Sequence, residues 1–199
     1  MNEEMLNQYL VGFDEINQMI STSYRLAVTE LEDVQDQSAQ IVDDLLSMLI
    51  LAYTAGVEAT AQHLAADLSV ELDALEDALY MPIDGKTFEQ RVQEYVFARD
   101  MNGLSIVAAS EYHRIYNAGA YDAAMQYVRT QGLGVTKRWV TVGDDRVRET
   151  HRYLEAMSVD VDEEFYTSDG DHAPYPGAFR KAKNNVGCRC IVIYDSEEA

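Results

Sequence analysis

Basic residues are scarce in this chain. Its 199 residues include 15 Lys and Arg against 35 Asp and Glu, which gives a formal net charge of −20. The acidic residues are spread along the whole chain, and no block of Lys or Arg compensates them. Sequence-independent binding to nucleic acid relies on Lys and Arg that neutralise phosphates. We therefore expect no direct sequence-specific contact with nucleic acid, and either a basic protein partner or simple solubility as the use of this charge.

Cysteine is almost as rare. The two cysteines, Cys188 and Cys190, are separated by one residue. This spacing is poor for a disulfide that closes a loop, and it is unlike the disulfide framework of a secreted domain. We expect both side chains to be thiols or thiolates.

Targeting and membrane signals are also missing. The stretch MNEEMLNQYLVGF lacks a basic region followed by a purely apolar one, so it does not predict a secretory signal. The most apolar stretch, Leu45–Val57, is interrupted by Ser47 and Thr54 and is too short to span a bilayer. We expect no membrane contact, and a soluble protein of a reducing cytoplasm or of a particle.

The common enzyme motifs are absent as well. The sequence has no Gly-rich phosphate loop, no Gly-x-Ser-x-Gly elbow, no His-Glu-x-x-His and no deaminase signature. Ser21-Thr22-Ser23 imitates a fragment of the ADP-ribosyltransferase signature, but it lies inside a helical pattern and the other parts of that fold are missing. We expect a protein that is not an enzyme.

Apolar residues recur at helical spacing from Met1 to about Arg129. A first stripe consists of Leu6, Tyr9, Leu10, Phe13, Ile16 and Ile20. A second stripe predicts a helix of about 30 residues, long for a globular domain, and consists of Leu31, Val34, Ile41, Val42, Leu45, Leu46, Leu49, Tyr53 and Gly56. The N-terminal region is therefore predicted to be all helix.

Local signals divide the rest of this region. Ser69 is a predicted cap of a short helix, and Thr87 with Gln90 forms a capping-box pattern that starts another. A further helix is expected to begin near Asn102, with an end or a kink at Asn117 and Gly119. The loop 131–134 is the expected boundary, because the apolar period changes from helical to strand-like beyond it.

The C-terminal region is predicted to be a small α+β unit. Trp139–Val142 and Ile191–Tyr194 are expected strands, and Asp145–Met157 is an expected helix. The predicted fold class is thus α+β, with long amphipathic helices over residues 1–131 that dock on a partner and a compact module over residues 135–199. A unit of about 65 residues has little core and often needs a metal, a disulfide or a partner surface.

One order of signals runs from Lys137 to Tyr194. A Trp-bearing strand, an acidic turn, a short helix with His151, the Pro/Gly segment GDHAPYPG and the Cys-x-Cys of NNVGCRC precede the apolar IVIY. This order resembles the phage Mu protein F-like minor head domain. The resemblance implies a structural protein of a tailed-phage virion, located in the head and, during assembly, in the host cytoplasm. It also implies several copies per particle, the portal or major capsid protein as partner, and roles in head assembly, genome packaging or ejection.

The resemblance also implies a metal site. Many family members place a Cys-x-x-Cys pair on the short helix, and those positions fall here on Arg148 and His151. Arginine cannot ligate a metal, so the implied ligands are His151, Cys188 and Cys190, with zinc as the ion. His172 or Asp145 would be the fourth ligand. The alternative is a metal-free core in which two small apolar side chains lie beside a buried imidazole.

Other residues of this region have structural interpretations. We expect Trp139 to pack in the small core, Asp145 to cap the short helix, and Arg148 to pair with a carboxylate or with backbone carbonyls. Tyr112, Tyr116 and Tyr121 suit either core or interface, while His63 and His113 have no assigned partner. Two alternative functions remain: a metal-dependent hydrolase or toxin-associated protein using His151, Cys188 and Cys190, and a capsid decoration protein.

Overall fold

A computed structural model describes residues 18–29 and 32–197. Most of the first predicted stripe, from Leu6 to Ile16, and Leu31 of the second lie outside these residues. Residues 18–29 are helical. The longer helices that follow are α2 (Val34–His63), α3 (Leu72–Tyr80), α4 (Phe88–Phe97) and α5 (Met101–Gln131). The C-terminal elements are β1 (Val135–Val140), α6 (Glu149–Arg152), β2 (Ser158–Asp160), β3 (Phe165–Tyr166), β4 (His172–Ala173), α7 (Ala182–Asn185) and β5 (Ile191–Ser196).

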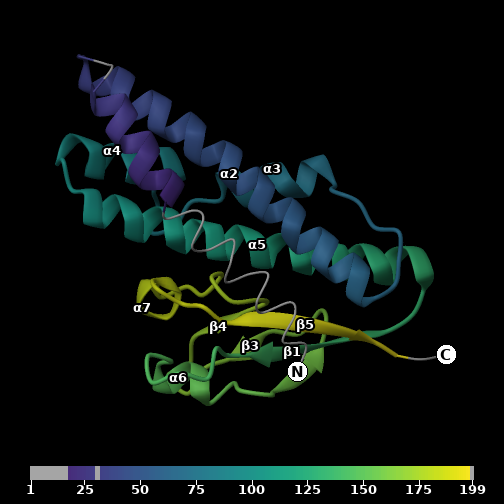
Figure 1. The fold of residues 1–199 in the computed structure, drawn as a ribbon. Coiled ribbons are helices and arrows are strands. Elements are labelled where there is room, and N and C mark those ends of the chain that lie inside the picture. Colours follow the sequence, from purple (N-terminus) through teal and green to yellow (C-terminus); the bar gives the residue numbers. More distant parts are fainter. Residues whose placement is uncertain (1–17, 30–31, 198–199) are drawn as a thin grey trace.

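The fold is α+β, as predicted, with a helical layer stacked on a small β module (Figure 1). In Figure 1 the helix of residues 18–29, α2, α3 and α4 lie on one side of α5, and the strands lie on the other. The loop after Gln131 leads from α5 into β1. Whether residues 135–199 fold without the helices stays a prediction.

Helices α2 and α5 pack backbone against backbone at two glycines. A Cβ atom added at Gly56 would lie 2.1 Å from the carbonyl oxygen of Tyr116, and one added at Gly119 would lie 2.2 Å from that of Tyr53. The predicted helix end at Asn117 and Gly119 is wrong, since α5 is continuous through both residues. Gly119 serves a close helix contact that the local sequence does not reveal.

Side-chain caps start three of the helices. The predicted capping box of Thr87 and Gln90 is confirmed at the start of α4, and the carboxylates of Asp33 and Asp100 accept hydrogen bonds from the first turns of α2 and α5. The prediction that Ser69 caps α3 is wrong. The N-cap of α3 is Glu71, which makes no side-chain cap hydrogen bond. Gly132, with a φ of 69°, ends α5 in the left-handed region, where glycine carries no steric cost.

Helix α2 is longer than the apolar stretch Leu45–Val57. Within the described residues it is a helix long and apolar enough to cross a membrane by length and composition. Half of its most apolar window is buried inside the fold, where it packs against α4 and α5. Core helices of soluble proteins pass the same test of length and composition.

The module is built on a three-stranded antiparallel sheet in the order β2-β1-β5, with β3 and β4 as a separate pair. In the register of β1 and β5, Trp139 lies opposite Val192. Both faces of β5 are buried. Ile191 and Ile193 belong to the core of the helical layer, whereas Val192 and Tyr194 belong to the core of the module. This position explains why the first four residues of β5, Ile191 to Tyr194, are all apolar rather than alternating with polar residues.

Two predicted elements of the module need correction. The Trp-bearing strand is β1, which starts and ends earlier than Trp139–Val142. The helix predicted over Asp145–Met157 is only the single turn α6, because Ala156 takes a positive φ and donates its N–H to the carbonyl of Trp139. Strands β2, β3 and β4 are two or three residues long, too short to show a period in the sequence.

Candidate metal centre

His151, Cys188 and Cys190 converge in the core of the module. The two cysteines directly precede β5, and His151 lies on α6. The Nδ1 atom of His151 lies 3.4 Å from Sγ of Cys188 and 3.5 Å from Sγ of Cys190. The three ligand atoms all lie within 4.8 Å of one another. The structure thus brings together the three side chains that the sequence nominated.

Aromatic rings enclose this cluster. The ring of Trp139 stands edge-on to the imidazole of His151 at 5.4 Å, and Phe179 contacts that imidazole at the same centroid distance. Phe165 packs against the other side of Trp139. No ligand side chain is more than 4% exposed. The surroundings therefore exclude bulk water from the sulfur and nitrogen atoms.

The donor set fits a zinc ion. Zn–S bonds of about 2.3 Å and a Zn–N bond of about 2.0 Å at tetrahedral angles separate sulfur from nitrogen by about 3.5 Å, and the observed separations are 3.4 and 3.5 Å. Mixed thiolate and imidazole ligation is typical of zinc. The Nε2 atom of His151 is buried without a hydrogen-bond partner among the described residues, which leaves Nδ1 as the atom aimed at both sulfurs.

The pKa values of the two thiols are shifted in opposite directions. Burial opposes ionisation of Cys188, but hydrogen bonds from Cys190, His113 and His151 and the charge of His113 hold the pKa of Cys188 well below its usual range. The hydrogen bond and charge of Cys188, together with burial, raise the pKa of Cys190 well above its usual range. One sulfur is thus prepared as a thiolate ligand, and binding of a metal would release the proton of the other.

Neither proposed fourth ligand reaches the cluster. The Nδ1 atom of His172 lies 2.5 Å from a carboxylate oxygen of Glu164, and the ring stacks on Tyr166. Asp145 is exposed. Among the described residues the metal-ligating group contains His151, Cys188 and Cys190 alone.

Arg148 and Asp144 hold the segment that carries the cysteines. Arg148 donates from Nη2 to the carbonyl of Val186 at 2.6 Å, one of the pairings predicted for it. Asp144 accepts two hydrogen bonds, of 2.7 and 2.8 Å, from Nη2 of Arg189, the residue between the two cysteines. The hydrogen bond and charge of Arg189 lower the pKa of Asp144. The capping role expected for Asp145 does not appear, because the N-cap of α6 is Arg148, which makes no side-chain cap hydrogen bond.

Helix α5 contributes a buried polar layer that sequence reasoning missed. Nε2 of His113 lies 2.8 Å from the carbonyl oxygen of Cys190. Glu111, 1% exposed, accepts from Arg91 at 3.0 Å and from Arg114 at 2.7 Å. Gly177 permits the close approach to this layer, since a Cβ atom there would lie 2.8 Å from Cα of Arg114. The i, i+3 spacing of Glu111 and Arg114 was the available sequence signal.

Lys137 is another buried charged residue that the sequence did not reveal. Its side chain on β1 is 0% exposed, and Nζ donates to the carbonyl of Pro174 at 2.9 Å. The ammonium lies over the rings of Tyr121 and Phe165, at 5.1 and 5.3 Å from their centroids. Burial lowers the pKa of Lys137 to about 8 despite nearby carboxylates. Tyr121 is thus part of a cation contact, while Tyr112 and Tyr116 are core residues.

Comparison with known proteins identifies the family. Residues 71–193 match the model of the family described as Phage Mu protein F like protein. The match covers more than half of the chain, so the chain belongs to this family. It begins well before the predicted module and includes α3, α4 and α5. The match therefore includes α5, which packs against β5, and not only the strands and the Cys-x-Cys.

Two relatives carry different names. Minor head protein GP7 of Bacillus phage SPP1 is 33% identical over 89 residues, which is 45% of this chain and 28% of that protein. NAD(+)--arginine ADP-ribosyltransferase EFV of Enterococcus faecalis is 24% identical over 233 aligned positions, which cover 94% of this chain and 48% of that protein. The chain thus spans about half of one relative and less of the other. No solved structure matches.

Proposed function

We propose that this protein is a structural subunit of a phage head that docks on the portal or on the inner capsid during head assembly. The observation that carries this proposal is the 33% identity to a minor head protein, within a family match over residues 71–193. Its role is assembly rather than turnover, in several copies per particle, with a contribution to genome packaging or ejection.

The buried centre supports a structural role. A catalytic zinc site keeps one coordination position open to water or substrate. Here the ligand side chains are at most 4% exposed and lie behind aromatic rings. His151, Cys188 and Cys190 would hold zinc as a link between α6 and the start of β5. When bound, the ion would cross-link these two segments and so stabilise a small core.

The charge of the chain supports a protein partner rather than DNA. A net charge of −20 opposes direct neutralisation of phosphates. The long helices offer several exposed apolar side chains, among them Leu51, Leu72 and Phe97. Such side chains suit contacts between subunits.

The relative named as an ADP-ribosyltransferase motivates a second candidate, because its alignment covers 94% of this chain. The aligned part is under half of that protein. In this chain Ser21, Thr22 and Ser23 lie within the helix of residues 18–29, and Ser23 donates to Asp44. This placement favours a packing role for the three residues. We therefore propose that this chain itself does not carry the transferase activity.

Quantitative mass spectrometry of gradient-purified particles tests the proposal. The copy number of this protein is measured relative to the portal and major capsid proteins. Low-copy presence is the expected result, while a copy number near that of the major capsid protein would indicate a decoration protein. Absence from particles, together with consumption of NAD⁺ by the purified chain, would overturn the proposal in favour of the transferase.

A further inference from the structure

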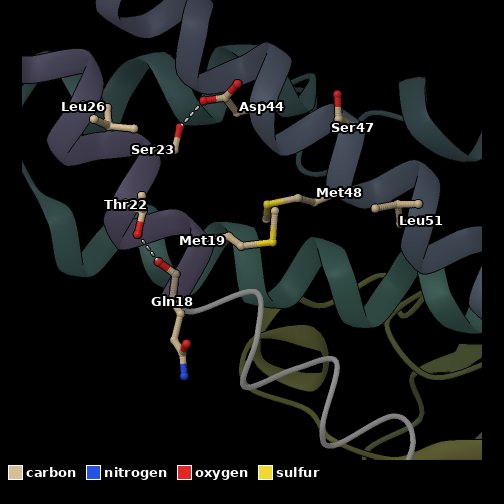
Figure 2. A pocket seen from close by; sticks show the side chains of 9 residues that line it. All are labelled: Gln18, Met19, Thr22, Ser23, Leu26, Asp44, Ser47, Met48 and Leu51. Carbon is tan, nitrogen blue, oxygen red and sulfur yellow. Dashed lines mark hydrogen bonds between the residues drawn. The ribbon is translucent and has the colours of Figure 1, made fainter. Parts of the chain in front are cut away.

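The helix of residues 18–29 and α2 form an open groove on the helical layer, with a volume of about 610 Å³ (Figure 2). The two helices run antiparallel. Figure 2 shows the side chains of Met19 and Met48 pointing toward each other, and Ser23 donates to Asp44 one turn further along. The groove is therefore the seam between two helices on the side where no third helix of the described residues covers it.

Each helix contributes one stripe to the groove. Residues at positions i, i+3, i+4 and i+7 line it from both sides: Met19, Thr22, Ser23 and Leu26 from the first helix, and Asp44, Ser47, Met48 and Leu51 from α2. Two stripes with this spacing that lie side by side form the kind of groove that receives the apolar face of another helix. The shape of the site therefore suits an α-helix laid along the seam.

The apolar side chains that line the groove are more exposed to solvent than the stability of a single chain requires. Leu51 is 66% exposed, Met19 49% and Leu26 47%. The polar lining groups are already satisfied within the chain: Thr22 and Ser47 donate to the carbonyls four residues earlier, and Asp44 accepts from Ser23 and Gln40. Recognition by this groove thus depends on apolar contact and on the charge of one carboxylate.

The charge selects among possible occupants. Asp44 is the one charged side chain among the described residues that line the groove. Helix α2 carries Asp36, Asp43, Asp44 and Glu58 and no Lys or Arg, while residues 18–29 carry Arg25 and no carboxylate. A second copy of this chain would bring the same acidic helix to the groove, and like charges disfavour that contact. We propose that the groove binds an amphipathic helix of another protein, with apolar residues at i, i+3 or i+4, and i+7 and a Lys or Arg beside Asp44. This inference rests on the proposed function only in taking that partner to be another head protein.

A synthetic probe tests the groove directly. A fluorescein-labelled peptide of about five helical turns, with Leu at i, i+3, i+7 and i+10 and Lys on the flanks, is titrated into the full chain and followed by anisotropy. A matched peptide has Glu in place of each Lys. The expected result is saturable binding of the Lys peptide at least about tenfold tighter than of the Glu peptide, with the difference reduced in Asp44→Asn. Absence of saturable binding would overturn the inference.

Variants locate the binding. Leu51→Glu and Leu26→Glu are expected to weaken binding of the Lys peptide by at least about tenfold. Leu72→Glu, on α3 and 75% exposed, is the matched control and should leave binding unchanged. Because all three side chains are exposed, far-UV circular dichroism should show an intact fold in each. Equal weakening by Leu72→Glu would overturn the location.

Other occupants give distinct results. A concentration-dependent dimer in sedimentation velocity that Leu51→Glu dissolves would assign the groove to a second copy. Tighter peptide binding by Phe13→Glu would assign it to residues 1–17 of the same chain. Either result overturns the partner assignment. Presence of the protein in particles without peptide binding refutes the groove alone, whereas peptide binding without presence in particles refutes the proposed function alone.

Discussion

The Nε2 atom of His113 lies 2.8 Å from the carbonyl oxygen of Cys190, and this contact joins α5 to the segment that carries both cysteines. His113 is 0% exposed, so bulk water does not reach this contact in the folded protein. The same ring lowers the pKa of Cys188 by its charge and hydrogen bond. The helical layer therefore takes part in the centre of the module.

Replacing His113 should destabilise the protein measurably. His113→Ala leaves a buried carbonyl without its partner and opens a cavity, so we expect a loss of about 3 kcal/mol in the free energy of unfolding, measured by urea titration. His63→Ala is the control, since His63 pairs with Asp195 in a partly exposed contact of 3.0 Å and should cost under about 1 kcal/mol. Equal losses of unfolding free energy in the two variants would show that the buried His113 contact stabilises the protein no more than the partly exposed His63 contact.

The buried cluster should hold zinc. Protein from metal-replete medium is expected to contain about one zinc per chain by inductively coupled plasma mass spectrometry, since three donors stand at zinc spacing. Cys188→Ser and His151→Ala should lose the ion, whereas His172→Ala should keep it, because His172 contacts Glu164 instead. Zinc-free wild-type protein would identify the cluster as an ordinary core of thiols and an imidazole.

Cysteine replacement also tests the domain boundary. If residues 135–199 form a unit of their own, Cys188→Ser with Cys190→Ser should reduce amide protection from hydrogen exchange after Gly134 and leave most of the helices protected. Residues of β5 pack in the helical core, so protection should also fall where α5 contacts β5. Uniform loss along the chain would instead define one cooperative unit.

The crossing of α2 and α5 should not tolerate a methyl group. Gly56→Ala and Gly119→Ala place a Cβ atom 2.1 and 2.2 Å from backbone oxygens. Backbone cannot move aside as a side chain can, so we expect losses of about 3 kcal/mol or more in thermal or urea unfolding. Gly134→Ala is the matched control, because its Cβ would meet only the flexible end of Glu197, and it should change stability by less than about 1 kcal/mol.

Lys137 should make stability rise with pH on the alkaline side of neutrality. Burial lowers its pKa from 10.5 to about 8 in the folded state, so the unfolded chain binds more protons than the folded chain between these values. The free energy of unfolding must then increase with pH over this window. Urea titrations at pH 7.5 and 9.5 should show the increase in wild type.

A matched pair of variants isolates the lysine. In Lys137→Met the increase between pH 7.5 and 9.5 should be clearly smaller, because the buried ammonium is gone and only other groups such as Cys188 still titrate in this window. Lys86→Met removes a partly exposed lysine that pairs with Glu94, and it should keep the increase. An unchanged slope in Lys137→Met would mean that other groups account for the whole increase.

Local signals in the sequence were sufficient for much of the architecture. The helical period predicted a long helix at α2, although the predicted stripe ended at Gly56 and the helix continues to His63. Thr87 and Gln90 predicted the start of α4, and the change of period after Gln131 separated helices from strands. These features depend on residues a few positions apart, so the chain encodes them locally.

Contacts between distant segments were decided only by the tertiary structure. Gly119 looked like a helix end because the residue that needs its lack of a side chain, Tyr53, is far away in the sequence. His172 was nominated as a ligand by its type, yet the hairpin of β3 and β4 places it beside Glu164. The sequence by itself determined the long helices, the family pattern and the three members of the candidate metal cluster, His151, Cys188 and Cys190. Only the packed fold decided three other features: the burial of β5 between two layers, the contact of His113 with Cys190, and the rings that surround Lys137. Each depends on groups that meet only when separate elements pack together.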